Sequence, residues 1–106
     1  MSSRKNVFEK LEQDFDLFEW NDEKCELNFE KHHIDFDDAI TIFGGPIIRK
    51  RSDRDGETRH LAVGLLEGIE IAVIYTERNG VCRVISARRA RKNEREAYHE
   101  AFPGGP

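Results

Sequence analysis

Residues 58–87 read TRHLAVGLLEGIEIAVIYTERNGVCRVISA, and this stretch decides the fold. Asn79-Gly80 predicts a two-residue hairpin turn, because both central positions of a type I′ turn need a positive φ. Glu67-Gly68 predicts a second hairpin turn of the same length. We therefore expect three strands, over 58–66, 69–78 and 81–87, and consecutive hairpins make them an antiparallel sheet.

Segments on both sides of these hairpins predict helices. Asn21 is a suitable N-cap for a helix that runs to about His32, with acidic residues in its first turn. A second helix starts at Asp35 and stops at Gly44, which is followed by Gly and Pro. The apolar residues of this segment follow helical spacing, as do those of a C-terminal helix expected over 92–102.

Three weaker patterns complete the fold prediction. The segment 15–20 alternates like a short strand, 47–51 is a further strand candidate, and 4–14 has the spacing of a short helix. We expect an α+β fold in which an antiparallel sheet of about four strands packs with two N-terminal helices and one C-terminal helix. The expected organisation is an N-terminal extension over 1–17, a single domain over 18–102 and a loose tail over 103–106.

Composition limits the class of protein. With 106 residues and a net charge of −4, the chain has the size of one domain. Its apolar runs are far shorter than the ~20 residues of a membrane helix, and no secretory signal is visible. Cys25 and Cys82 have neither disulfide nor metal-ligand spacing and suit a reduced, cytoplasmic protein. The sequence argues against a membrane protein, a zinc enzyme and a multidomain enzyme, and it predicts no cofactor.

Charge is distributed unevenly along the chain. Residues 1–46 hold five Lys or Arg against twelve Asp or Glu, whereas residues 47–106 hold twelve against nine. The densest basic stretch, 83–95, includes Arg88 and Arg89. Such a run is most often the solvated face of a helix, but Arg also offers a planar fork that suits phosphate. Charge alone favours the first interpretation.

Strand pairing brings polar residues into a row on the sheet. Two-residue turns at both hairpins pair Leu61 with Ile74 and Ile74 with Ile85, with Val63-Ala72-Ala87 as a second apolar row. The same register predicts a third row, Arg59-Thr76-Arg83, at the rim of the apolar face. Two arginines there need anions beside them. These anions are either carboxylates of the acidic first half or a bound phosphate, and a nearby helix face with Lys24, Lys31 and His32 would fit the phosphate.

Short motifs along the chain share one family pattern. They are Phe18-Glu19-Trp20, Lys24, Asn28, Lys31-His32, Phe36, Ala39, Gly56-Glu57-x-Arg59, Tyr75-Thr76-x-Arg78, the run RVISARRA at 83–90, Glu94-Arg95 and Tyr98. In this order they resemble BrnT-type toxins over about residues 18–98. His33 stands where the family commonly has Gly, and Arg91 stands where Thr often caps the last helix.

The resemblance implies a fold, an activity and a partner. BrnT-type proteins are the toxins of bacterial type II toxin–antitoxin pairs, look like the RelE superfamily in fold, and act as metal-independent ribonucleases. Their partner is BrnA, a DNA-binding antitoxin that neutralises the toxin and represses the operon. We therefore expect RNA as substrate, a BrnA-like antitoxin as partner, and contact with operator DNA only through that antitoxin.

Metal-free RNA cleavage suggests roles for individual residues. The 2′-OH attacks the adjacent phosphate, so the enzyme must move protons and stabilise extra negative charge. His32 is the natural acid/base candidate, and Arg59 and Arg83 would hold the phosphorane. Tyr75 lies on the opposite face from Arg59 in the expected register. Contacts to flanking phosphates are expected from Lys24, Lys31, Arg88 and Arg89. The alternative is a non-enzymatic binding module whose arginine face docks an acidic partner.

Overall fold

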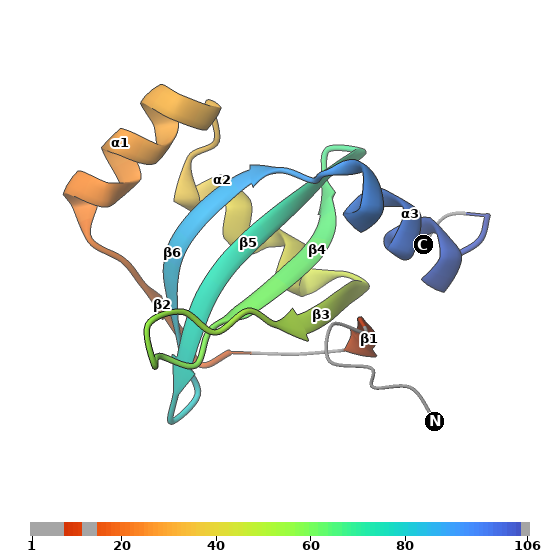
Figure 1. Ribbon diagram of the computed structural model, residues 1–106. Coiled ribbons are helices and arrows are strands. Elements are labelled where there is room, and N and C mark those ends of the chain that lie inside the picture. The colour runs from red at the N-terminus through yellow and green to blue at the C-terminus, as the bar shows by residue number, and fades with distance from the viewer. Residues whose placement is uncertain (1–7, 12–14, 105–106) are drawn as a thin grey trace.

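The computed structural model describes residues 8–11 and 15–104 and shows an α+β domain built on one six-stranded sheet (Figure 1). The strand order across the sheet is β1-β3-β4-β5-β6-β2. The elements are β1 (Glu9–Leu11), β2 (Leu17–Glu19), α1 (Asp22–His32), α2 (Phe36–Ala39), the 3-10 helix η1 (Ile40–Gly44), β3 (Ile47–Arg51), β4 (His60–Leu66), β5 (Ile69–Arg78), β6 (Val81–Arg89) and α3 (Lys92–Ala101).

The two tight hairpins form as the sequence predicts. Glu67 and Gly68 have φ values of 50° and 81°, and Asn79 and Gly80 have 55° and 80°, so all four residues adopt the left-handed region. The β4–β5 register confirms Leu61 opposite Ile74 and Val63 opposite Ala72. Thr76 lies opposite Arg83, as expected from the turn at Asn79-Gly80.

A β-bulge in β6 changes the register beyond that point. Tyr75 lies opposite Val84, but Ile74 lies opposite Ser86, so Ile85 is an extra residue in β6. The predicted pairs Ile74–Ile85 and Ala72–Ala87 are therefore wrong. Because side chains alternate along a strand, the bulge moves every later side chain of β6 to the other face of the sheet.

The sheet is larger and more mixed than predicted. β3 to β6 form the expected antiparallel core, but two three-residue edge strands extend it, and β2 runs parallel to β6. The helix predicted over 4–14 is wrong for residues 9–11, which form β1 against β3. Residues 4–7 and 12–14 of that prediction lie outside the described part of the chain.

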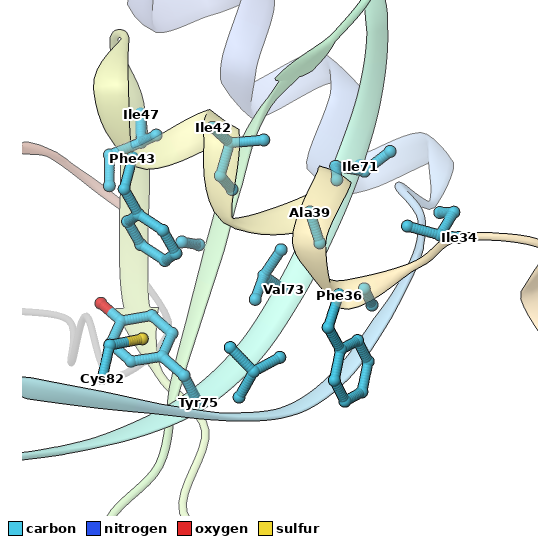
Figure 2. Packing of buried hydrophobic residues seen from close by; sticks show 13 residues of the cluster. Ile34, Phe36, Ala39, Ile42, Phe43, Ile47, Ile71, Val73, Tyr75 and Cys82 are labelled. Carbon is cyan, nitrogen blue, oxygen red and sulfur yellow. The ribbon is translucent and has the colours of Figure 1, made fainter. Parts of the chain in front are cut away.

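Each face of the sheet packs against different helices. One face buries Ala62, Val73 and Tyr75 against residues of α2 and η1, among them Phe36 and Phe43 (Figure 2). The other face packs Leu61, Val63 and Ala72 with Tyr98 of α3. We call these the α2 face and the α3 face. The parity of the strands places Thr76 and Arg83 on the α3 face, beyond the part that α3 covers.

Helix α1 is attached to β6 by one buried side chain. Asn28 donates from Nδ2 to the carbonyl oxygens of Ala87 and Ile34 at 2.9 and 3.0 Å, and its Oδ1 accepts from the Ala87 N–H at 3.1 Å. The predicted N-cap is confirmed, because the Asn21 side chain accepts from the Lys24 N–H. The helix ends at His33 with φ of 59°, a conformation in which glycine carries no steric cost.

The remaining helix predictions are also confirmed. The Asp35 side chain caps α2 as expected, and the helix continues as 3-10 to Gly44. In α3, Glu94 reaches back to accept from the Arg91 N–H at 2.8 Å, which supplies half of a capping box. Among the described residues, the model contains no helix with the length and apolar character to cross a membrane.

Candidate functional site

A groove of about 710 Å³ lies at the end of the sheet where the β5–β6 hairpin meets the loop between β3 and β4. Strand β2 supplies one lining residue, so three parts of the chain that are distant in sequence meet there. The lining residues are Glu19, Gly56, Glu57, Thr58, Thr76, Glu77, Arg78, Asn79, Val81 and Arg83. The groove therefore contains the part of the predicted polar row that strands β5 and β6 carry.

Arg83 is the arginine that the sheet itself places in this groove. Its Nη1 lies 3.0 Å from the Glu19 Oε2, and the two side chains are 50% and 53% exposed. The backbone fixes this pair, because Glu19 of β2 lies directly beside Arg83 of β6 in the parallel register. A cation this exposed remains open to a competing anion, since surface ion pairs contribute only ~0–1 kcal/mol.

The loop between β3 and β4 contributes Glu57 to the groove from a hydrogen-bonded turn. Arg54 and Glu57 exchange two backbone hydrogen bonds of 3.0 and 2.9 Å around Asp55 and Gly56, which have φ values of 52° and 80°. Glu57 Oε1 accepts from the Arg59 Nε at 2.7 Å. Arg59 is 25% exposed and holds Glu57, but it is not itself a lining residue. Strand β4 begins at His60, so the predicted row does not extend as a strand to Arg59.

His32 lies at the other end of β6. Helix α1 starts next to the Glu19–Arg83 pair and runs along β6 until Asn28 reaches Ala87, so His32 is close to Arg88. Four ladder steps separate Arg83 from Arg88, because Ile85 is the bulged residue, and they correspond to a strand rise of roughly 13 Å. The structure thus brings Arg59 and Arg83 to one end of the sheet and places His32 at the opposite end.

The surroundings of His32 are positively charged. Burial and the neighbouring charges of Lys31, Arg88 and His33 lower the pKa of His32, so its imidazole is largely neutral at pH 7. Lys24 and Lys31 are exposed one turn before and after Asn28, the residue that contacts β6. Lys31, His32 and the exposed Arg89 form a basic end of the α1–β6 unit, which we call the His32 end, whereas Lys24 lies in the first turn of α1, toward the end that carries Arg83.

Arg88 has a structural partner that the predicted strand register did not indicate. The bulge turns its side chain toward α3, where Nη1 and Nη2 donate to the two carboxylate oxygens of Glu94 at 2.8 and 2.9 Å. Both side chains are largely buried, with exposures of 15% and 4%. In this bidentate pair an arginine of the basic run binds a carboxylate of the protein itself. Both terminal nitrogens of Arg88 donate to Glu94.

A known protein family matches most of this chain. Residues 20–94 match the family model described as the BrnT ribonuclease toxin of type II toxin–antitoxin systems. This chain belongs to the BrnT family. It is therefore a type II toxin of the ribonuclease class, with RNA as target and an antitoxin as partner. A search of curated proteins found no match for the chain.

The BrnT match covers every lining residue of the groove except Glu19, which lies one position before it. Tyr75 is on the α2 face, as the sequence predicts, and burial raises its pKa to about 12. Sequence reasoning missed Glu19, Glu57 and Arg78 as members of the site. A signal for Glu57 was present, because residues two apart in extended chain share a side and Glu57 is two residues before Arg59.

Proposed function

We propose that this BrnT-family toxin cleaves RNA without a metal ion, at the groove that contains Arg83 and Arg78. The observation that carries the proposal is the exposed Arg83 guanidinium. The β2–β6 register holds it at the groove, where it binds the carboxylate of Glu19. A guanidinium that binds a carboxylate in this way presents the same fork of donors to a phosphate.

The chemistry follows from the charges at the groove. The 2′-oxygen bonds to phosphorus, the P–O5′ bond breaks, and the products are a 2′,3′-cyclic phosphate and a free 5′-OH. Negative charge grows on the phosphoryl oxygens in the transition state. Arg83 meets that charge after phosphate displaces Glu19, and Arg78 adds a second cation. Thr76, which lies opposite Arg83 and two residues before Arg78, supplies a hydroxyl that can donate to the same oxygens.

We assign the His32 end to the nucleotides that flank the cleaved bond. The neutral His32 ring lies close to Arg88, at the other end of β6 from Arg83, and is therefore not placed to exchange a proton with a group at the groove. The exposed cations Lys24, Lys31 and Arg89 are suited to the phosphates of a strand that continues along α1 and β6. In this proposal Arg88 positions α3 through Glu94 and contributes to RNA binding only through its charge.

For the partner, we propose a BrnA-like antitoxin that covers the groove and alone carries the contact with operator DNA. The alternative remains a non-enzymatic binding module for an acidic partner. Its support is that Arg83 and Arg59 both hold carboxylates of this chain. The two proposals differ in what RNA does at the groove, which an RNA cleavage assay decides.

The deciding experiment is RNA cleavage in EDTA with matched variants. Single-stranded RNA is incubated with the parent protein, with Arg83→Ala, and with Lys92→Ala, which removes an exposed cation of α3. The parent should cleave and leave 2′,3′-cyclic phosphate ends, and an all-deoxy strand should stay intact. Arg83→Ala should be ~10²- to 10³-fold slower, and Lys92→Ala should match the parent within twofold.

Growth inhibition gives the same contrast in cells. Expression of the chain alone should arrest bacterial growth, and Arg83→Ala should relieve the arrest while the purified variant still melts like the parent. Cleavage that requires a divalent ion would overturn metal independence. An Arg83→Ala variant as active as the parent would move the site away from the groove.

A further inference from the structure

We propose that Glu57 is the general base of the groove and that Arg59 positions it, an inference that rests on the ribonuclease function proposed above. The juxtaposition that carries it is a carboxylate that lines the same groove as Arg83, lies on a turn closed by two backbone hydrogen bonds, and accepts a hydrogen bond from the Arg59 guanidinium. The phosphate-binding role predicted for Arg59 becomes a positioning role.

The position of Glu57 is fixed by its backbone. The turn at Asp55-Gly56 closes with two hydrogen bonds between Arg54 and Glu57. Asp53 then anchors the next segment, because its carboxylate accepts from the Arg59 N–H at 3.3 Å and from the Arg51 Nη2 at 2.6 Å. A catalytic group needs such support, since errors of about 0.5 Å in its position already weaken its effect.

The Arg59 side chain sets the orientation of this carboxylate. Its Nε donates to Oε1 at 2.7 Å, and Arg59 is half as exposed as Glu57, at 25% against 52%. Glu57 lines the groove, whereas Arg59 does not. The single contact leaves lone pairs of the carboxylate for a substrate hydroxyl.

Three other groups fit this role less well. Glu77 also lines the groove, but it has the strand parity of Tyr75 on the α2 face, and its Oε1 lies 4.0 Å from the Arg49 Nη1. Glu19 lies on Arg83, where the phosphate must bind, so it is displaced as the substrate enters. His32 lies near Arg88, at the other end of β6. Glu57 keeps its own cation when the phosphate takes Arg83, so it remains in place during the reaction.

The proton transfer can be written in full. Glu57 removes the proton of the 2′-OH as the 2′-oxygen bonds to phosphorus. The P–O5′ bond breaks, and the departing 5′-oxygen takes a proton from solvent water, to which the groove is open. Glu57 then returns its proton to solvent. The products are a 2′,3′-cyclic phosphate and a 5′-OH, and no oxidant or reductant takes part.

The test compares Glu57→Gln with Glu96→Gln, which changes an exposed carboxylate on α3. Cleavage is measured on a short RNA in EDTA, and binding is measured on the same RNA with a 2′-deoxy residue at the cleavage site. Glu57→Gln should lower kcat ~10²- to 10³-fold and leave the Kd of the uncleavable RNA within twofold. Glu96→Gln should match the parent in both measurements.

A pH–rate profile separates catalysis from a structural role. The parent rate should fall on acidification, because a general base must be unprotonated to act, and Arg59→Ala should lower kcat while the Kd of the uncleavable RNA stays within twofold. A parent profile without an acidic limb would overturn the proposal even if Glu57→Gln failed to fold. Full activity of Glu57→Gln beside an inactive Arg83→Ala would overturn it and leave the ribonuclease function intact. No cleavage by the parent would instead overturn that function itself.

Discussion

Replacing Asn28 by Ala should detach the end of helix α1 from the sheet. The Asn28 side chain is 8% exposed and makes three hydrogen bonds, to the N–H and C=O of Ala87 and to the C=O of Ile34. Alanine removes all three bonds and leaves these backbone groups without the partner that satisfies them. No water reaches such groups easily when they are buried, so their desolvation is no longer offset.

The expected loss of stability follows from counting these bonds. A net contribution of about 1 kcal/mol for each bond gives a loss of about 3 kcal/mol in the free energy of unfolding. For a domain of this length, 1 kcal/mol corresponds to roughly 4–8 °C in Tm, so Tm should fall by roughly 12–24 °C. The cavity left by the amide adds to this loss rather than reducing it.

Urea unfolding and thermal melting measure the effect, and Asn93→Ala is the matched control. Asn93 is exposed in the first turn of α3, so its replacement should change stability by less than about 0.5 kcal/mol. A loss below about 1 kcal/mol in the free energy of unfolding for Asn28→Ala would show that the hydrogen bonds to β6 do not hold α1 in place.

Two further substitutions test the packing and the electrostatics of the fold. Gly64→Ala should lower the free energy of unfolding in urea by about 1–3 kcal/mol, because a Cβ there would lie 2.8 Å from the Ile42 Cβ. Gly44→Ala, with open space around it, should be nearly neutral. Equal effects of the two substitutions would contradict this packing. Burial opposes ionisation of Glu94, but hydrogen bonds from Arg88 and the helix N-terminus outweigh it and lower the pKa below its ordinary 4.5. The stability that this group contributes is therefore present above pH 4.5 and lost as the pH falls below it. Glu94→Gln should lower the free energy of unfolding by about 3 kcal/mol at pH 7. Thermal melts across pH 3–7 should show a weaker acid dependence for this variant than for the parent.

The sequence predicts those parts of the fold that depend on local chemistry. Both hairpins follow from left-handed turn residues, and the position of Arg83 follows because it lies only a few residues from the turn at Asn79-Gly80. The bulge at Ile85 has no such signal, since its neighbours are all compatible with a regular strand. Its effect is large, because it turns Arg88 from an expected RNA contact into the buried partner of Glu94.

The site was predicted in part for the same reason. Arg83 and Thr76 are found in the groove because strand parity fixes them. Glu57 enters the groove through the conformation of a loop, and Glu19 enters it through a three-residue edge strand whose pairing is non-local. Neither is specified by periodicity. His32 was expected near the arginines because its helix is polar, but the direction of α1 along β6 places it at the far end.

The most direct test of the account is the cleavage of a ribodinucleotide by Arg83→Ala and His32→Ala. A dinucleotide holds a single phosphate, so its contacts stay close to the cleaved bond, whereas His32 lies at the other end of β6. We predict that Arg83→Ala lowers kcat by ~10²- to 10³-fold, whereas His32→Ala changes it by less than about threefold. The reverse result, with His32→Ala inactive and Arg83→Ala close to the parent, would place the catalytic centre at the His32 end and contradict the account.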